Sequence, residues 1–267
     1  MRVQSLTLVA AGVALLAPTA PPAAAQPPHE RPVSRGVSRV PQGDARLPRG
    51  DARLPRGDAR LPRGDARPTR TEGRVSAAEL LARVRGCAQV SRGRYRTDAA
   101  APADVPVCGT RGAVYWKADL DIDCDGRPTA RCNRRTDPSF SAGTAYQQSD
   151  GRHLAAERLP YIVVPAPSRV WDHRDQGIRG GSVAAVIYRG RVQYAVVGDT
   201  GPRDIIGEAS YATAQRLGIH SDPRGGGAAS GVTYIVFRNT RVTPIEDHRS
   251  AVSTGERAAR RLVRHDG

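Results

Sequence analysis

A seven-residue repeat limits where this chain can form a folded core. Gly-Asp-Ala-Arg-Leu-Pro-Arg begins at Gly43 and recurs at Gly50 and Gly57, and a degenerate copy begins at Gly64. Each full unit contains a glycine, a proline and only one large apolar residue, so the repeat cannot form the apolar seam of a coiled coil. We expect residues 26–75 to be a disordered linker, because they bury too little apolar surface to offset the entropy of ordering.

The first 25 residues have the pattern of a secretory signal peptide. Arg2 supplies the positive start, residues 6–16 form a short apolar run, and Ala23-Ala24-Ala25 provides a small-residue cleavage site. The apolar run is shorter than a bilayer-spanning helix requires. We therefore predict a secreted, extracellular protein with no membrane contact once the signal is removed. Residues 76–267 are long enough for one well-buried domain.

The net charge of +15 is unevenly distributed. Residues 26–75 carry 12 arginines and 6 acidic residues, and the excess in residues 76–267 is scattered among acidic residues. A nucleic-acid-binding domain usually has a dense basic face with interleaved aromatic residues or a recognisable motif, and the chain has neither. We therefore predict no nucleic-acid partner.

The cysteine count predicts two disulfide bonds. Cys87, Cys108, Cys124 and Cys132 are an even set in an exported chain, which favours disulfides over a metal site. No two of them have the C-x-x-C spacing of a zinc or redox motif. Three pairings are possible, and the simplest joins Cys87 to Cys108 and Cys124 to Cys132.

Short apolar runs rich in Val, Ile and Tyr predict a mostly β fold. The expected strands are 113–122, 160–165, 182–189, 192–199 and 231–238, and a turn at 189–191 is expected to join two of them into a hairpin. Three helices are expected: 76–85 after a capping box at Ser76, 209–217 ending at Gly218, and a last one after a capping box at Ser253. This balance favours a barrel or a sandwich over a parallel α/β fold.

Residues 115–125 form a strand pattern with an acidic face. Period two separates two sets of side chains. One set is Tyr115, Lys117, Asp119, Asp121 and Asp123, and the other is Trp116, Ala118, Leu120 and Ile122. Neighbouring carboxylates repel each other. A row of three is therefore more stable under water, a cation or a cationic ligand, and the alternative to a binding site is a solvated acidic face.

Calcium is one candidate for that cation. Asp121-x-Asp123-x-Asp125-Gly126 matches the first half of a calcium-binding loop, but the twelfth position is Cys132 where a bidentate Glu is required. A calcium site of another kind stays open, together with a calcium-dependent interaction protein as a hypothesis. We predict no metal and no cofactor.

A second acidic segment follows the strand that ends at Asp199. A loop punctuated by Gly and Pro leads from Asp199 to Glu208, at the start of an expected helix. General acid–base hydrolysis needs two carboxylates in different environments. Burial beside Ile205 and Ile206 would raise the pKa of Glu208, whereas a helix N-terminus would lower it. No G-x-S-x-G or H-E-x-x-H motif points to serine or zinc chemistry.

The two acidic segments together resemble glycoside hydrolase family 75, the chitosanases. The resemblance rests on residues 118–126, 196–202 and 206–210, with 161–165 between them, and it covers about residues 85–250. It implies a six-stranded, double-psi-like barrel with a few short helices after the linker. It also implies an endo-acting, inverting enzyme that cleaves β-1,4 links in chitosan.

The resemblance assigns the catalytic pair to Asp199 and Glu208. Glu208 is expected to be the general acid and Asp199 the base, although Asp121 or Asp119 could supply the base instead. For substrate binding we expect Asp119, Asp121, Asp123, Lys117 and Tyr194. Chitosan carries ammonium groups that a carboxylate row would attract. We expect a monomer, and the alternative function is a non-catalytic protein that binds extracellular polysaccharide or cell wall.

Overall fold

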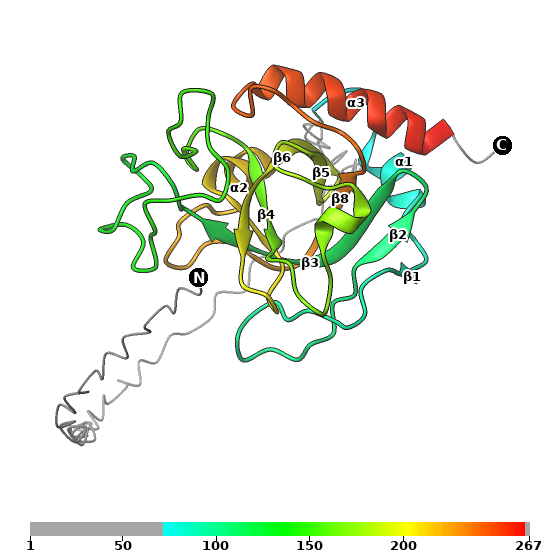
Figure 1. The fold of residues 1–267 in the computed structure, drawn as a ribbon, viewed down its shortest axis with the longest axis horizontal. Coiled ribbons are helices and arrows are strands. Elements are labelled where there is room, and N and C mark those ends of the chain that lie inside the picture. The colour runs from blue at the N-terminus through cyan, green and yellow to red at the C-terminus, as the bar shows by residue number, and fades with distance from the viewer. Residues whose placement is uncertain (1–71, 265–267) are drawn as a thin grey trace, which may run out of the picture. The chain divides into compact units, whose positions relative to one another are not determined.

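Six strands close into a barrel in the computed structural model, which describes residues 72–264 (Figure 1). Their order around the barrel is β3, β7, β4, β6, β5 and β8, and β8 pairs with β3 to complete it. The strands are β3 (Ala113–Asp123), β4 (Tyr161–Pro165), β5 (Val183–Tyr188), β6 (Arg191–Gly201), β7 (Glu208–Ser210) and β8 (Ala228–Phe237). The predicted six-stranded barrel is confirmed.

The barrel mixes parallel and antiparallel pairs. β3 runs parallel to β7, and β4 runs parallel to β6, whereas β5 pairs antiparallel with β6 and β8. Two short strands, β1 (Ala88–Gln89) and β2 (Cys108–Thr110), add an antiparallel extension beside β3. The parallel pairs bring the acidic ends of β3 and β6 to the neighbourhood of β7, where the candidate site lies.

Both faces of the barrel strands are buried, so apolar side chains lie on both faces and not only on alternate positions. The outward set packs under α1 (Ala77–Ala82) and α3 (His248–Arg264), and Figure 1 shows α3 lying across the strands. The inward set fills the barrel, where Trp116 stacks on Tyr234 with ring centroids 5.3 Å apart. Trp116 is therefore core, as the period-two pattern predicts.

Local sequence signals account for several turns and helix ends. Arg189 and Gly190 both have positive φ and form a two-residue loop between β5 and β6, which is the geometry of a type I′ hairpin. Ser76 and Glu79 form the predicted capping box of α1. Gly218 ends α2 (Tyr211–Leu217) in the left-handed conformation. A 3₁₀ helix, η1 (His173–Gln176), was not predicted.

Two predicted helix starts are wrong. Residues 208–210 form strand β7, and α2 begins only after the N-cap Ser210. The last helix begins at His248, five residues before Ser253, because Asp247 accepts a hydrogen bond from the Ser250 amide at 3.0 Å and so caps its first turn. The Ser253 hydroxyl instead donates to the Ser250 carbonyl within the helix.

The packed part of the chain extends to Glu72, four residues before the predicted domain boundary. Glu72 Oε2 accepts a hydrogen bond from the Tyr194 amide at 2.9 Å, and Val75 is buried. The predicted signal peptide and the rest of the predicted linker lie outside the described residues. No helix within residues 72–264 is long and apolar enough to cross a membrane.

Candidate active site

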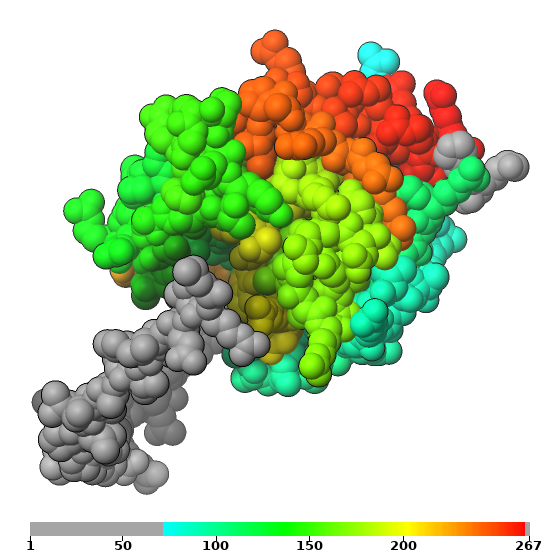
Figure 2. Space-filling model, viewed as in Figure 1, coloured from blue at the N-terminus to red at the C-terminus, as the bar shows by residue number. Residues whose placement is uncertain are grey.

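An acidic pocket of about 330 Å³ opens where β3, β6 and β7 meet. Of the residues that the structure describes, six carboxylates line it, and no lysine or arginine does. They are Asp121, Asp123, Asp125, Asp137, Asp199 and Glu208. Figure 2 shows the surface hollowed between the green segment that follows β3 and the yellow atoms near residue 200. The pocket therefore combines a strongly negative lining with an open side that admits an extended ligand.

A β-bulge places Asp199 in this pocket. Ile162 on β4 lies opposite Val197 on β6, but the next residue, Val163, lies opposite Asp199, so Gly198 is the extra residue. A bulge reverses the side-chain alternation beyond it. Val197 points into the barrel, whereas Asp199 shares the outward face of Val163. A Cβ on Gly198 would come within 2.6 Å of Tyr161 Cγ, so the bulge requires glycine there.

Asp199 is buried and held by the backbone. Its Oδ1 accepts hydrogen bonds from the amides of Ala145 and Thr200, each at 2.7 Å. Burial raises the pKa of Asp199, and these two hydrogen bonds oppose the rise because they favour the ionised form. The carboxylate is thus fixed in orientation, with an oxygen left to act on a ligand.

Glu208 has a different environment. It lies on β7 opposite Asp121 of β3, and a Cβ on Gly201 would come within 2.8 Å of its Oε2. Burial raises its pKa to about 7, with smaller contributions from Asp121, Asp125 and Asp199. Glu208 precedes the N-cap Ser210 by two residues, so it does not occupy the first turn of the helix where the dipole would lower its pKa. Glu208 therefore holds its proton to a higher pH than an ordinary glutamate does.

The acidic end of β3 supplies the pocket's floor. Asp121 and Asp123 line it as the alternation predicts. Asp125 also lines it, accepts the Ser141 amide at 2.7 Å, and has a pKa raised to about 6 by burial. Asp125 belongs to the same Asp-x-Asp-x-Asp run and could have been included from that pattern. Asp137 lies in the long segment after β3 and had no sequence signal.

Three predicted substrate-binding residues do not line the pocket. Tyr194 is fully buried under α3, where its hydroxyl donates to Glu256 Oε2 at 3.3 Å, so it cannot stack on a sugar ring. Lys117 is exposed on β3 outside the pocket. Asp119 is buried against Gly207, and its Oδ1 has no hydrogen-bond partner among residues 72–264. Burial raises the pKa of Asp119 to about 7.

The described residues also bear on the calcium hypothesis. Within residues 72–264, no group of three or more His, Cys, Asp or Glu side chains is arranged to hold a metal ion. Asp123 Oδ1 instead accepts the Asp125 amide at 2.6 Å.

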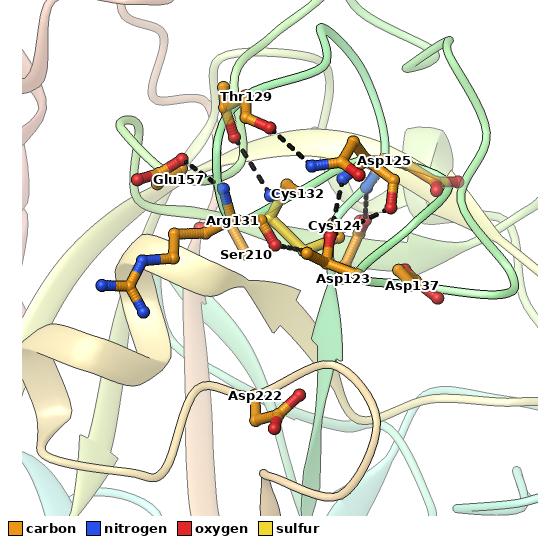
Figure 3. The surroundings of a disulfide bond; sticks show 12 residues. Asp123, Cys124, Asp125, Thr129, Arg131, Cys132, Asp137, Glu157, Ser210 and Asp222 are labelled. Atoms are coloured by element: carbon orange, nitrogen blue, oxygen red, sulfur yellow. Dashed lines mark hydrogen bonds between the residues drawn. A yellow bond between two sulfur atoms is a disulfide. The ribbon is translucent and has the colours of Figure 1, made fainter.

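Both predicted disulfides are present, with nearest-neighbour pairing. Cys87 is bonded to Cys108, and Cys124 to Cys132. Figure 3 shows the second bond directly beside Asp123 and Asp125, with Asp137 on the same side. Because Cys124 stands between two pocket carboxylates in the chain, this disulfide fixes the turn that presents them.

The raised pKa of Glu208 predicts a pH-dependent stability. A group whose pKa rises from 4.5 to about 7 on folding holds its proton more tightly in the folded protein. Its contribution to the free energy of unfolding is complete below pH 4.5 and is lost as the pH rises to about 7. We expect the melting temperature to fall over this range, and to fall less in Glu208→Gln. A difference between the two proteins that does not vary with pH would contradict this assignment.

A comparison with protein families identifies the family of the chain that forms this pocket. The model of the family described as fungal chitosanase of glycosyl hydrolase group 75 matches residues 120–260, which is more than half of the chain. The chain belongs to this family. The matched region contains the acidic end of β3, the bulge of β6 and the Glu208 strand, so the glycosyl hydrolase group 75 match covers every carboxylate of the pocket.

Individual relatives agree with the group 75 assignment. Endo-chitosanase C of Aspergillus oryzae is 32% identical over 133 residues, which are 48% of this chain and 32% of that protein. An endo-chitosanase of Aspergillus fumigatus is 28% identical over 174 residues, or 59% of this chain and 73% of its own length. The chain thus spans about a third of the first relative and most of the second.

Proposed function

We propose that the chain is a secreted enzyme that hydrolyses β-1,4 links within chitosan and inverts the anomeric configuration. One observation carries the proposal: Glu208, whose pKa burial raises to about 7, and the backbone-held Asp199 line one acidic pocket. An inverting glycosidase needs such a pair, with its carboxyl groups roughly 6.5–9.5 Å apart so that a water fits between base and sugar.

The two environments suggest the division of labour. Glu208 donates its proton to the leaving glycosidic oxygen, because a pKa raised to about 7 suits a general acid that works near neutral pH. Asp199 accepts a proton from water on the opposite face of the sugar, because two amides hold its charged form in one orientation. Asp121 is a second candidate base, since it lines the pocket opposite Glu208. Asp119 is less favoured as the base, because it is buried and does not line the pocket.

The charge of the pocket supports chitosan as substrate. Glucosamine units carry ammonium groups, and the six carboxylates attract them, with no basic residue of the described part of the chain in the lining. Neutral glucans gain nothing from this field. The test is the release of reducing ends from chitosan, with cellulose and chitin as controls. We expect release from chitosan, and activity on cellulose but not on chitosan would overturn the substrate assignment.

Removing the disulfide beside the site is expected to cost activity as well as stability. The double variant Cys124→Ser/Cys132→Ser should lose about 2–4 kcal/mol of unfolding free energy. It should also hydrolyse chitosan more slowly while still folded, because Asp123 and Asp125 lose their fixed turn. Cys87→Ser/Cys108→Ser is the matched control, since that bond lies outside the pocket lining. Equal loss of activity in both folded variants would contradict this role.

A further inference from the structure

A second pocket has a lining of the opposite charge. Its volume is about 400 Å³, and among residues 72–264 three arginines but no carboxylate line it. The arginines are Arg174, Arg179 and Arg241. Much of the remaining wall is apolar and comes from Val242, Pro244 and Ile245. An acidic active site with a basic neighbour is unexpected for an enzyme that acts on a polycation.

One short segment joins the two pockets. The Ala145 amide donates to Asp199 in the acidic pocket, and the next residue, Tyr146, lines the basic one. The Tyr146 ring packs on Gly180, where an added Cβ would lie 2.6 Å from ring carbons. The pKa of Tyr146 is raised, mainly by burial. Arg174 and Arg179 oppose this rise, and Asp199 adds to it. The adjacent residues Ala145 and Tyr146 therefore contribute to both sites, one by holding Asp199 and the other by lining the basic pocket.

The three arginines of this pocket differ in how their charge is balanced. Asp172 pairs with Arg174 at 2.6 Å and neutralises it. Arg179 Nη1 donates to the carbonyls of Arg174 and Ile178 at 2.9 and 3.2 Å, which fixes the guanidinium without balancing its charge.

The nearby acids do not balance these two charges. Within residues 72–264, neither Arg179 nor Arg241 has a carboxylate partner within 4.0 Å. The neighbouring Glu246 accepts the Ser149 amide instead.

We infer that this basic pocket is a sugar-binding position that selects an N-acetylated unit of the polymer against a glucosamine unit. The inference rests on the proposed function. Two unbalanced guanidinium groups repel the ammonium of glucosamine, whereas an acetamide has no charge. Its carbonyl oxygen accepts hydrogen bonds from arginine, and its methyl group suits the apolar wall. The acidic pocket then takes the cationic units and the basic pocket the acetylated one.

The test is a binding comparison in the Glu208→Gln background, where the ligands are not consumed. The ligands are hexamers of glucosamine and of N-acetylglucosamine, and the variants are Arg179→Gln and Arg241→Gln. Each variant should bind the glucosamine hexamer about five-fold more tightly, because a repulsive charge at the binding site is removed. Neither variant should bind the acetylated hexamer more tightly. Arg257→Gln, an exposed substitution on α3, is the matched control and should change neither affinity.

Two results would overturn the inference. One is an equal change, or no change, in the affinities for both hexamers. The other is binding of inorganic phosphate that both variants abolish while the preference between hexamers stays constant, which would identify an anion site. Thermal unfolding checks that the variants are folded. Chitosan hydrolysis by the unaltered chain tests the proposed function separately, so the two failures are distinguishable.

Discussion

Glu208→Gln is expected to abolish hydrolysis of chitosan while leaving the polymer bound. The amide is close to the size of the carboxylic acid but cannot donate a proton to the leaving oxygen. General acid catalysis contributes about 10²–10⁴-fold, so the rate should fall by that factor. The other five carboxylates of the pocket remain and still attract the ammonium groups. The measurement is reducing-end release together with the affinity for chitosan.

Asp137→Asn is the matched control for that experiment. Asp137 lines the same pocket and carries a similar carboxylate, but the proposed mechanism gives it no proton to transfer. We expect a modest loss of affinity and a much smaller loss of rate. A chain that binds chitosan but releases no reducing ends before any substitution would instead be the non-catalytic polysaccharide-binding protein.

Asp199→Asn is expected to reduce hydrolysis by a similar factor, because it removes the general base where Glu208→Gln removes the general acid. The amide oxygen can still accept the hydrogen bonds of Ala145 and Thr200, so the local structure should survive. The charge that activates water is lost, and with it the base. The unfolding temperature should change little, because the amide replaces a buried carboxylate whose ionised form burial disfavours.

Asp121→Asn separates the two candidate bases. Asp121 is exposed at the end of β3 and lies opposite Glu208. If Asp199 is the base, Asp121→Asn should weaken chitosan binding more than it slows the bound reaction. Full activity in Asp199→Asn with none in Asp121→Asn would transfer the role to Asp121.

The long strands could be predicted from sequence because alternating apolar residues determine them. β3, β4, β5, β6 and β8 all fall where Val, Ile and Tyr cluster. β7 was missed because it has only three residues and is held by partners distant in sequence, Asp121 to Asp123 on β3. The start of α3 was misplaced because the sequence at Ser253 resembles a capping box, whereas Asp247 provides the actual cap.

The parts of the candidate site that could be predicted are those whose carboxylates lie close together in the sequence. The Asp121–Asp125 run and the Asp199–Glu208 segment both line the pocket. The orientation of Asp199 depends on the Gly198 bulge, whose register only the pairing of β4 with β6 defines. Tyr194 was predicted to bind substrate, but α3 covers it. The alternation of side chains along β6 predicts the face on which Tyr194 lies, but it does not predict that a helix packs on that face. Asp137 and the basic pocket depend on tertiary contacts between loops.

The most direct test follows the anomeric protons of the first products released from chitosan, by time-resolved NMR. An inverting pair made of Glu208 and Asp199 cleaves a β-link and so releases the α-anomer first, with the β-anomer appearing later by mutarotation. Glu208→Gln and Asp199→Asn should show neither signal on this time scale. Initial release of the β-anomer, or of no product, would contradict the account.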